Sequence, residues 1–177
     1  MDLGLFVLRL VVGGLFVGHG CQKLFGWFDG HGLDGTGGFF ESLGYKPGKR
    51  MAALAGLTET TGGSLLILGL LTPLAAAMII GVMVNAMIAV HAEKGVWNSD
   101  GGVELPLVYS VAAAAFAFAG PGAWSMDNAI GLSYTGVGWG LVVISVGLIV
   151  GVVVSGLRRE EEVAEEEAAP EERRSAA

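Results

Sequence analysis

The residues best placed to do chemistry are polar side chains inside long apolar stretches. Arg9 stands alone in the first stretch and Glu59 in the second. A charge at the centre of a bilayer costs about 2.5 to 3.5 kcal/mol on insertion scales, so neither side chain is expected to face lipid. Counted from the connected ends of the two expected helices, at 1.5 Å per residue, their depths are roughly 16 Å and 12 Å. The sequence therefore predicts an intramembrane pair of Arg9 and Glu59.

Two interpretations of this pair remain open. It can be a buried ion pair that holds two helices in register, because buried pairs are not by themselves evidence of catalysis. It can also be the catalytic centre of a proton or ligand site, in which Glu59 ionises and Arg9 tunes it. Glu59 shares a helical face with small residues, which favours an inward position; these are Ala52, Ala55, Gly56 and Gly63.

A second group of polar residues lies nearer the ends of the expected helices. Asn85 shares a face with Gly81 and Ala89, and three further side chains fall at helix ends on one side of the membrane: His19, His91 and Glu104. Together with Asn85 they predict a polar vestibule above the pair. Arg, Asn and His side chains can donate hydrogen bonds to a small ligand there, and His and Glu can relay protons. We interpret the four as candidate cofactor-binding residues; the alternative for the histidines is interfacial hydrogen bonding.

These residues are positioned by five apolar segments. Hydrophobic residues make up 53% of the chain and charged residues 15%, a balance typical of membrane proteins. Each segment approaches the roughly 20 residues that a helix needs to span the hydrocarbon core. The sequence predicts an all-α transmembrane bundle of four core helices plus a fifth, C-terminal transmembrane helix. The predicted spans are 3–20, 51–71, 74–91, 103–119 and 136–157.

Basic residues predict the orientation, because Lys and Arg in short loops stay on the cytoplasmic side. They occur in the first loop, in the third loop and at the start of the tail: Lys23, Lys46, Lys49, Arg50, Lys94, Arg158 and Arg159. Five spans would place all of them on one face. We expect a multi-pass protein of the plasma membrane with an uncleaved first span, its N-terminus outside and its C-terminal tail in the cytoplasm.

The chain divides into three zones. Residues 1–135 form the expected four-helix domain, residues 136–157 the extra helix, and residues 158–177 a tail with eight Glu and four Arg that is expected to be disordered. The first loop, 21–50, alternates aromatics with glycines, and Phe39, Phe40 and Leu43 can form one face of a short surface helix. This loop is either an interfacial hairpin that caps the bundle or a lid over a site between the helices.

Several motifs occur in an order that resembles the DoxX family, over roughly residues 5–131. They are HG-x-QKLFGWF-x-G at His19 to Gly30, GTGGFF at Gly35 to Phe40, LG-x-x-PG at Leu43 to Gly48, AG-x-x-E at Ala55 to Glu59, LGL-x-TPLAA at Leu68 to Ala76 and GPGAWSMD at Gly120 to Asp127. The resemblance implies a four-helix membrane bundle. It also implies a membrane subunit of a quinone-reducing oxidoreductase complex, such as those that oxidise thiosulfate.

The expected function is that of such a subunit, without a redox centre of its own and with quinone as the cofactor it contacts. No haem-attachment, zinc or phosphate-binding motif occurs, and no basic face suggests nucleic acid. A soluble oxidoreductase partner would supply electrons. Small residues at four-residue spacing, Gly14 with Gly18 and Gly147 with Gly151, predict close helix packing and permit a homo-oligomer. The alternatives are a transport or binding protein for a small solute or proton, and a membrane scaffold without catalysis.

Overall fold

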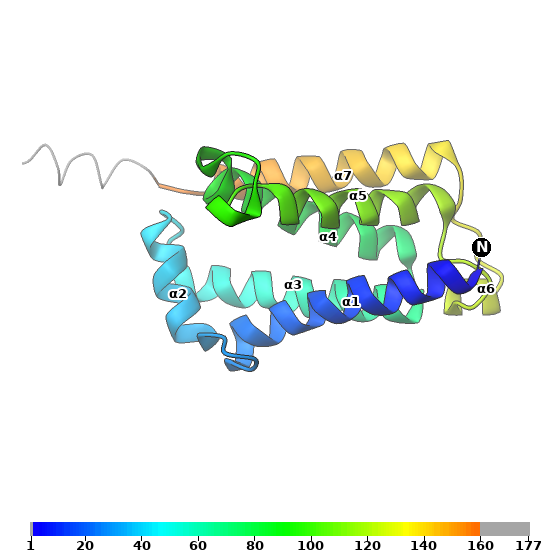
Figure 1. Ribbon diagram of the computed structural model, residues 1–177, viewed down its shortest axis with the longest axis horizontal. Coiled ribbons are helices and arrows are strands. Elements are labelled where there is room, and N and C mark those ends of the chain that lie inside the picture. The colour runs from blue at the N-terminus through cyan, green and yellow to red at the C-terminus, as the bar shows by residue number, and fades with distance from the viewer. Residues whose placement is uncertain (1, 160–177) are drawn as a thin grey trace, which may run out of the picture.

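The computed structural model describes residues 2–159, which form a bundle of helices. Five long helices follow one another in alternating direction (Figure 1), and two short helices lie in the connections. The long ones are α1 (Asp2–Phe25), α3 (Gly48–Leu68), α4 (Thr72–Ala86), α5 (Glu104–Ala119) and α7 (Val137–Ser155), and the short ones are α2 (Gly32–Ser42) and α6 (Met126–Ala129). The predicted all-α bundle is confirmed.

Four stretches in the described part of the chain are long and apolar enough to cross a membrane: α1, α3, Thr72–Lys94 and α7. The third is α4 together with a π-helical turn, η1 (Met87–His91), and a short 3-10 turn, η2 (Ala92–Lys94). A second 3-10 turn, η3 (Asn98–Asp100), precedes α5. At 16 residues, α5 is shorter than the roughly 20 that a perpendicular span needs.

The bundle has two distinct ends, which we name after their short helices. The α2 end carries α2, the α4–α5 connection and the end of α7, while the α6 end carries the start of α1, the α3–α4 turn and α6 (Figure 1). The backbone N–H of Arg159 donates to the carbonyl of Gly44 at 2.9 Å, which joins the end of the described chain to the α2 end. All the predicted basic segments therefore lie at one end. Which side of the membrane that end faces stays a prediction.

Glycines set the register between α1 and α3. A Cβ on Gly13 would lie 2.6 Å from the carbonyl oxygen of Gly63, and one on Gly20 would lie 2.7 Å from that of Gly56. These distances are far below van der Waals contact, so the two antiparallel backbones touch only because all four positions lack side chains. The helices are thus fixed with Gly13 opposite Gly63 and Gly20 opposite Gly56.

Glycines also join α7 to α4, as predicted for Gly147 and Gly151. A Cβ on either glycine would lie 2.6 Å from the Cβ of Ile80 or of Val84. The corresponding prediction for Gly14 and Gly18 is wrong, because a Cβ there would meet nothing within 4 Å in the described structure. Both face outward, and the adjacent position Gly13 makes the contact instead.

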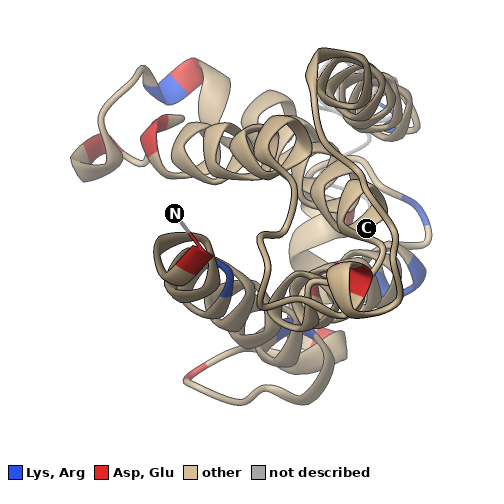
Figure 2. Ribbon diagram, turned by 90° about the vertical axis from the view of Figure 1, so that its right-hand side faces the viewer, with Lys and Arg blue, Asp and Glu red and all other residues tan. Residues whose placement is uncertain are grey.

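The surface of the bundle is apolar over most of its length. Large aliphatic side chains stand exposed on the outer faces of α1, α5 and α7, including Val7, Val108 and Ile149. Seen along the bundle, charged positions colour only short stretches of the ribbon (Figure 2). Exposed apolar surface of this extent is costly in water, so the hydrocarbon of a bilayer is its natural solvent.

The first loop is shorter than predicted. The helix expected to stop at Gly20 continues to Phe25, and α3 begins at Gly48. Glycine is tolerated inside membrane helices where neighbouring backbones come close, and Gly20 is such a contact. The expected short helix is present as α2, with Phe39 and Phe40 inside it and Leu43 just beyond its last residue. Of the predicted tail, residues 160–177 lie outside the described residues.

Candidate functional site

Arg9 is completely buried near the α6 end of the bundle. Its Nη2 donates a hydrogen bond to the backbone carbonyl of Trp124, and its guanidinium carbon lies 5.6 Å from the centroid of the Phe6 ring. Nε and Nη1 have no hydrogen-bond partner among the described residues. Arg9 therefore connects α1 to the segment between α5 and α6 and does not contact Glu59.

The predicted pair of Arg9 and Glu59 is therefore wrong, and the register of α1 against α3 explains why. Because α1 extends to Phe25, Arg9 lies 16 residues, or about 24 Å, from its end. Glu59 lies only 11 residues, or about 16 Å, from the start of α3. With Gly13 opposite Gly63, Arg9 faces the end of α3, well beyond Glu59.

Lys23 is the ionic partner of Glu59. Its Nζ donates a hydrogen bond to Oε1 at 2.9 Å and lies 2.8 Å from Oε2. The Glu59 side chain is only 3% exposed, whereas that of Lys23 is 24% exposed. Oε2 is buried and accepts no well-directed hydrogen bond. The sequence prediction places Lys23 in the first loop. Extending the predicted helix by one turn past Gly20 would include Lys23 and identify it as a candidate partner of Glu59.

A cavity of about 250 Å³ lies beside this ion pair, at the α2 end. Four of the predicted site residues line it: His19, Glu59, Asn85 and His91. Lys23 and Tyr109, which were not predicted as site residues, line it as well. Glu104 lies just outside, where its Oε2 accepts a hydrogen bond from the backbone N–H of Asn98, a wall residue. The structure thus brings three of the four predicted vestibule residues together with Glu59, while Glu104 and Arg9 lie outside the cavity.

Asn85 is held by a residue that sequence reasoning missed. The hydroxyl of Tyr45, in the α2–α3 connection, donates to Oδ1 of Asn85 at 2.5 Å. Tyr45 is almost fully buried, and this burial raises the pKa of its hydroxyl. The phenol therefore stays protonated near neutral pH and remains a donor. This bond joins the connection after α2 to the wall of the cavity.

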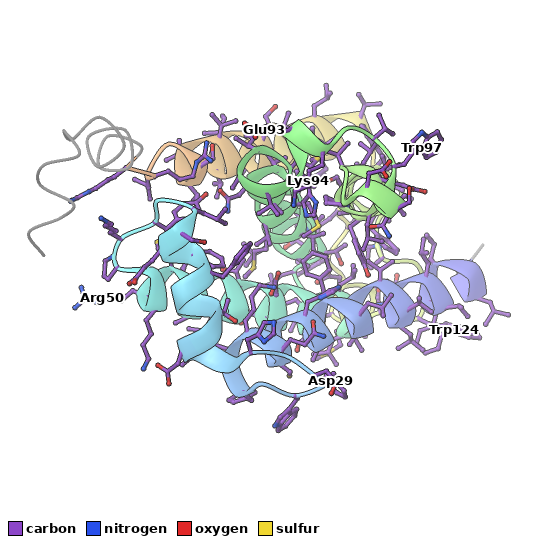
Figure 3. All side chains as sticks on the ribbon, turned by 60° about the vertical axis from the view of Figure 1, so that its left-hand side comes forward. Asp29, Arg50, Glu93, Lys94, Trp97 and Trp124 are labelled. Carbon is purple, nitrogen blue, oxygen red and sulfur yellow. The ribbon has the colours of Figure 1, made fainter. Side chains whose placement is uncertain are left out.

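His91 ends the π-helical turn η1. Its Nδ1 lies 2.6 Å from the carbonyl oxygen of Gly101, across the α4–α5 connection. A π-turn widens the helix by one residue, and such turns are frequent at functional sites. Here Ala89, Val90 and His91 all line the cavity. In the same connection, the side chains of Glu93, Lys94 and Trp97 are exposed, and that of Trp97 projects from the bundle (Figure 3).

The segment that was predicted as either a cap or a lid forms one wall of the cavity. Phe39, Phe40 and Leu43 all line it. The rings of Phe40 and Tyr45 lie 5.5 Å apart between centroids, which extends the apolar wall to the residue that holds Asn85. This arrangement favours the interpretation of the segment as a lid.

Asp127 is a second residue that sequence reasoning missed. Its carboxylate accepts hydrogen bonds from the backbone N–H groups of Leu71 and Thr72, at 2.8 and 2.9 Å, and from the Thr72 hydroxyl at 2.7 Å. Asp127 also donates its own N–H to the carbonyl of Gly69 at 2.9 Å. The motifs at 68–76 and 120–127 thus bind each other and cap the start of α4, far from the cavity.

Comparison with known proteins gives one family match and two relatives. The model of the DoxX family matches residues 4–92. A protein of Haemophilus influenzae described only as uncharacterized is 37% identical over 124 residues, covering 68% of this chain and 86% of that protein. An uncharacterized membrane protein of Mycobacterium tuberculosis is 30% identical over 141 residues, covering 74% of this chain and 83% of that protein. No solved structure matches.

Proposed function

Because the chain belongs to the DoxX family and is a multi-pass membrane protein, we propose that it is the membrane subunit of an oxidoreductase system. In this proposal the cavity at the α2 end binds the headgroup of a quinone. Electrons come from a partner protein, and the α2 end, with its short helices and polar connections, is the face at which that partner docks.

The observation that supports this proposal most is the composition of the cavity wall. It combines a buried ion pair with neutral hydrogen-bonding groups, among apolar side chains. Ring carbonyls need donors, and the Lys23 ammonium and the Tyr109 hydroxyl supply them. The quinone ring would lie against apolar residues such as Phe40 and Pro106. These residues fit a small, flat, doubly hydrogen-bonding group.

A bound quinone takes up two electrons and two protons when it is reduced to quinol. The chain must then hold protons close to the headgroup, and Glu59 with Lys23 provides a buried acid beside a partly exposed base. His19 lines the same cavity, and its Nδ1 lies 3.0 Å from Oε1 of Gln22. His19 can therefore pass protons between the α2 end and Glu59.

The test is the quinone content of protein purified in mild detergent from quinone-replete membranes. Wild type is compared with Glu59→Gln, which keeps the shape of the side chain and removes its charge. Glu93→Gln is the matched control, because Glu93 is exposed and lies outside the cavity. Stoichiometric quinone in wild type and Glu93→Gln, reduced in Glu59→Gln, supports the proposal. Wild-type protein without quinone contradicts it.

The buried Glu59 carboxylate favours one other candidate, a binding or transport site for a proton or small solute. An acid that pairs with a partly exposed lysine beside a cavity can exchange protons with a passing solute. That function predicts altered uptake in Glu59→Gln cells with unchanged respiratory electron flow. A pure scaffold predicts only lost stability in the same variant.

A further inference from the structure

A second hollow runs along the membrane-facing flank of the bundle, between α3 and α7 with α4 at its floor. It is a groove of about 480 Å³. Its walls include Leu54 and Thr58 from α3, Met78 and Gly81 from α4, and Val146 and Val150 from α7. The Thr58 hydroxyl donates to the carbonyl of Leu54 in its own helix, at 2.7 Å, so its hydrogen-bonding group is already satisfied. Apart from this hydroxyl, that of Thr61 and the amide of Asn85 at one end, the lining is apolar.

The groove and the polar cavity lie side by side and share four wall residues. Phe40, Ala55, Val82 and Asn85 line both. Asn85, fixed by Tyr45, thus lies at the junction between a polar chamber and an apolar channel. A ligand that filled both would have a hydrogen-bonding end at the α2 end and an apolar end directed toward the α6 end.

The dimensions of the groove suit a single hydrocarbon chain. On α4 it runs from Leu74 to Asn85, a rise of about 16 Å. That length and the mainly apolar walls suit a branched hydrocarbon chain lying along α4.

We propose that the groove binds the isoprenoid tail of the quinone whose headgroup lies in the cavity. This rests on the proposed function, because the apolar groove adjoins the cavity that binds the headgroup, and the tail is the apolar part of that same ligand. The ligand enters from the lipid between α3 and α7, with its ring leading toward Asn85. Quinones with prenyl chains are then bound more tightly than the same ring without a chain.

Helix α7, which forms one wall of the groove, lies outside the region that the family model matches. The family model ends at residue 92, and α7 begins at Val137. Gly147 and Gly151 bring α7 against α4, which places Val146, Val150 and Val154 along the groove. In this inference, α7 confers selectivity for the tail.

The experiment measures binding of two probes to protein in nanodiscs: a naphthoquinone with four prenyl units and 2-methyl-1,4-naphthoquinone, which has the ring alone. Val150→Trp fills the groove from α7, and Leu54→Trp fills it from α3. Their controls are Val153→Trp and Leu57→Trp, on the same helices at exposed positions outside the groove. Thermal melting of each variant verifies folding, and either groove variant that folds is sufficient.

We expect wild type to bind the prenylated probe about tenfold more tightly, with both affinities expressed against the probe concentration in the lipid, because the chain gains close contacts with the groove walls that the ring alone does not make. The groove variants should lose this preference and keep their affinity for the ring, while the controls keep both. Equal wild-type affinity for the two probes overturns the tail site and leaves the headgroup site standing. A groove variant that retains quinone but no longer copurifies a phospholipid also overturns the tail site and leaves the headgroup site standing. If wild type binds neither probe, the headgroup proposal fails as well.

Discussion

At the scale of single residues, the molecule separates two buried charges that the sequence would place together. Glu59 is neutralised by Lys23, which reaches it from near the end of α1. Arg9 is instead held by a backbone carbonyl and an aromatic ring at the other end of the bundle. The acid beside the cavity is thus paired with a base that remains partly accessible to water, as a proton-handling site requires.

The Lys23–Glu59 pair should respond unequally to removal of either partner. Lys23→Met leaves an almost fully buried carboxylate without its counter-charge, which typically costs about 3 to 5 kcal/mol. Glu59→Gln leaves a lysine that can turn toward solvent, so we expect a loss of about 1 kcal/mol. The free energies of unfolding in detergent measure this difference. Equal losses would contradict the assignment of Glu59 as the more deeply buried partner.

At the scale of elements, close contacts between glycines determine how the helices pack. Substitutions at two adjacent positions on α1 should affect stability differently. Gly13→Ala would drive a Cβ to 2.6 Å from the Gly63 carbonyl, so we expect the variant to lose about 2 kcal/mol or more. Gly14→Ala meets nothing and should be neutral or slightly stabilising. Thermal melting of the two variants side by side tests the register of α1 against α3; equal melting temperatures would refute it.

The turn between α3 and α4 depends on Asp127 as its cap. Asp127→Ala removes the acceptor for three hydrogen bonds in a buried position. We expect a loss of about 2 kcal/mol or more, because the two Thr72 donors left behind are also buried. Quinone retention per folded molecule should not change, since the cavity is at the other end. Asp100→Asn, at an exposed position, is the control for stability. A selective loss of quinone in Asp127→Ala would mean that the two ends are coupled.

How much of the site could be predicted from the sequence differs from residue to residue. The burial of Glu59 could be predicted, because a carboxylate cannot face lipid without a large cost. Its partner depends on whether the first helix stops at Gly20 or continues to Lys23, and only the longer helix identifies it. The grouping of His19, Asn85 and His91 followed from helix ends, which are set by apolar length. Tyr45 lies 40 residues from Asn85 in the chain, and only the folded arrangement brings the two side chains together.

At the scale of the whole molecule, the α2 and α6 ends lie at opposite ends of the long helices, so a membrane crossed by all five would separate them. The basic segments are at the α2 end, so we expect that end to be cytoplasmic. In a Cys21→Ser background, Ser99→Cys should react with a membrane-impermeant thiol reagent only in inside-out vesicles. Asn128→Cys should react only in right-side-out cells. The reverse pattern would mean that the orientation is inverted. Reaction of both cysteines from the same side would mean that α5 does not cross the membrane.

The hydrogen bond between Arg159 and Gly44 attaches the end of the described chain to the α2–α3 connection. Gly44 directly precedes Tyr45, whose hydroxyl donates to Asn85 in α4. Two adjacent residues of this connection are thus fastened to two different parts of the bundle, so the wall of the cavity and the end of the described chain share one anchor point.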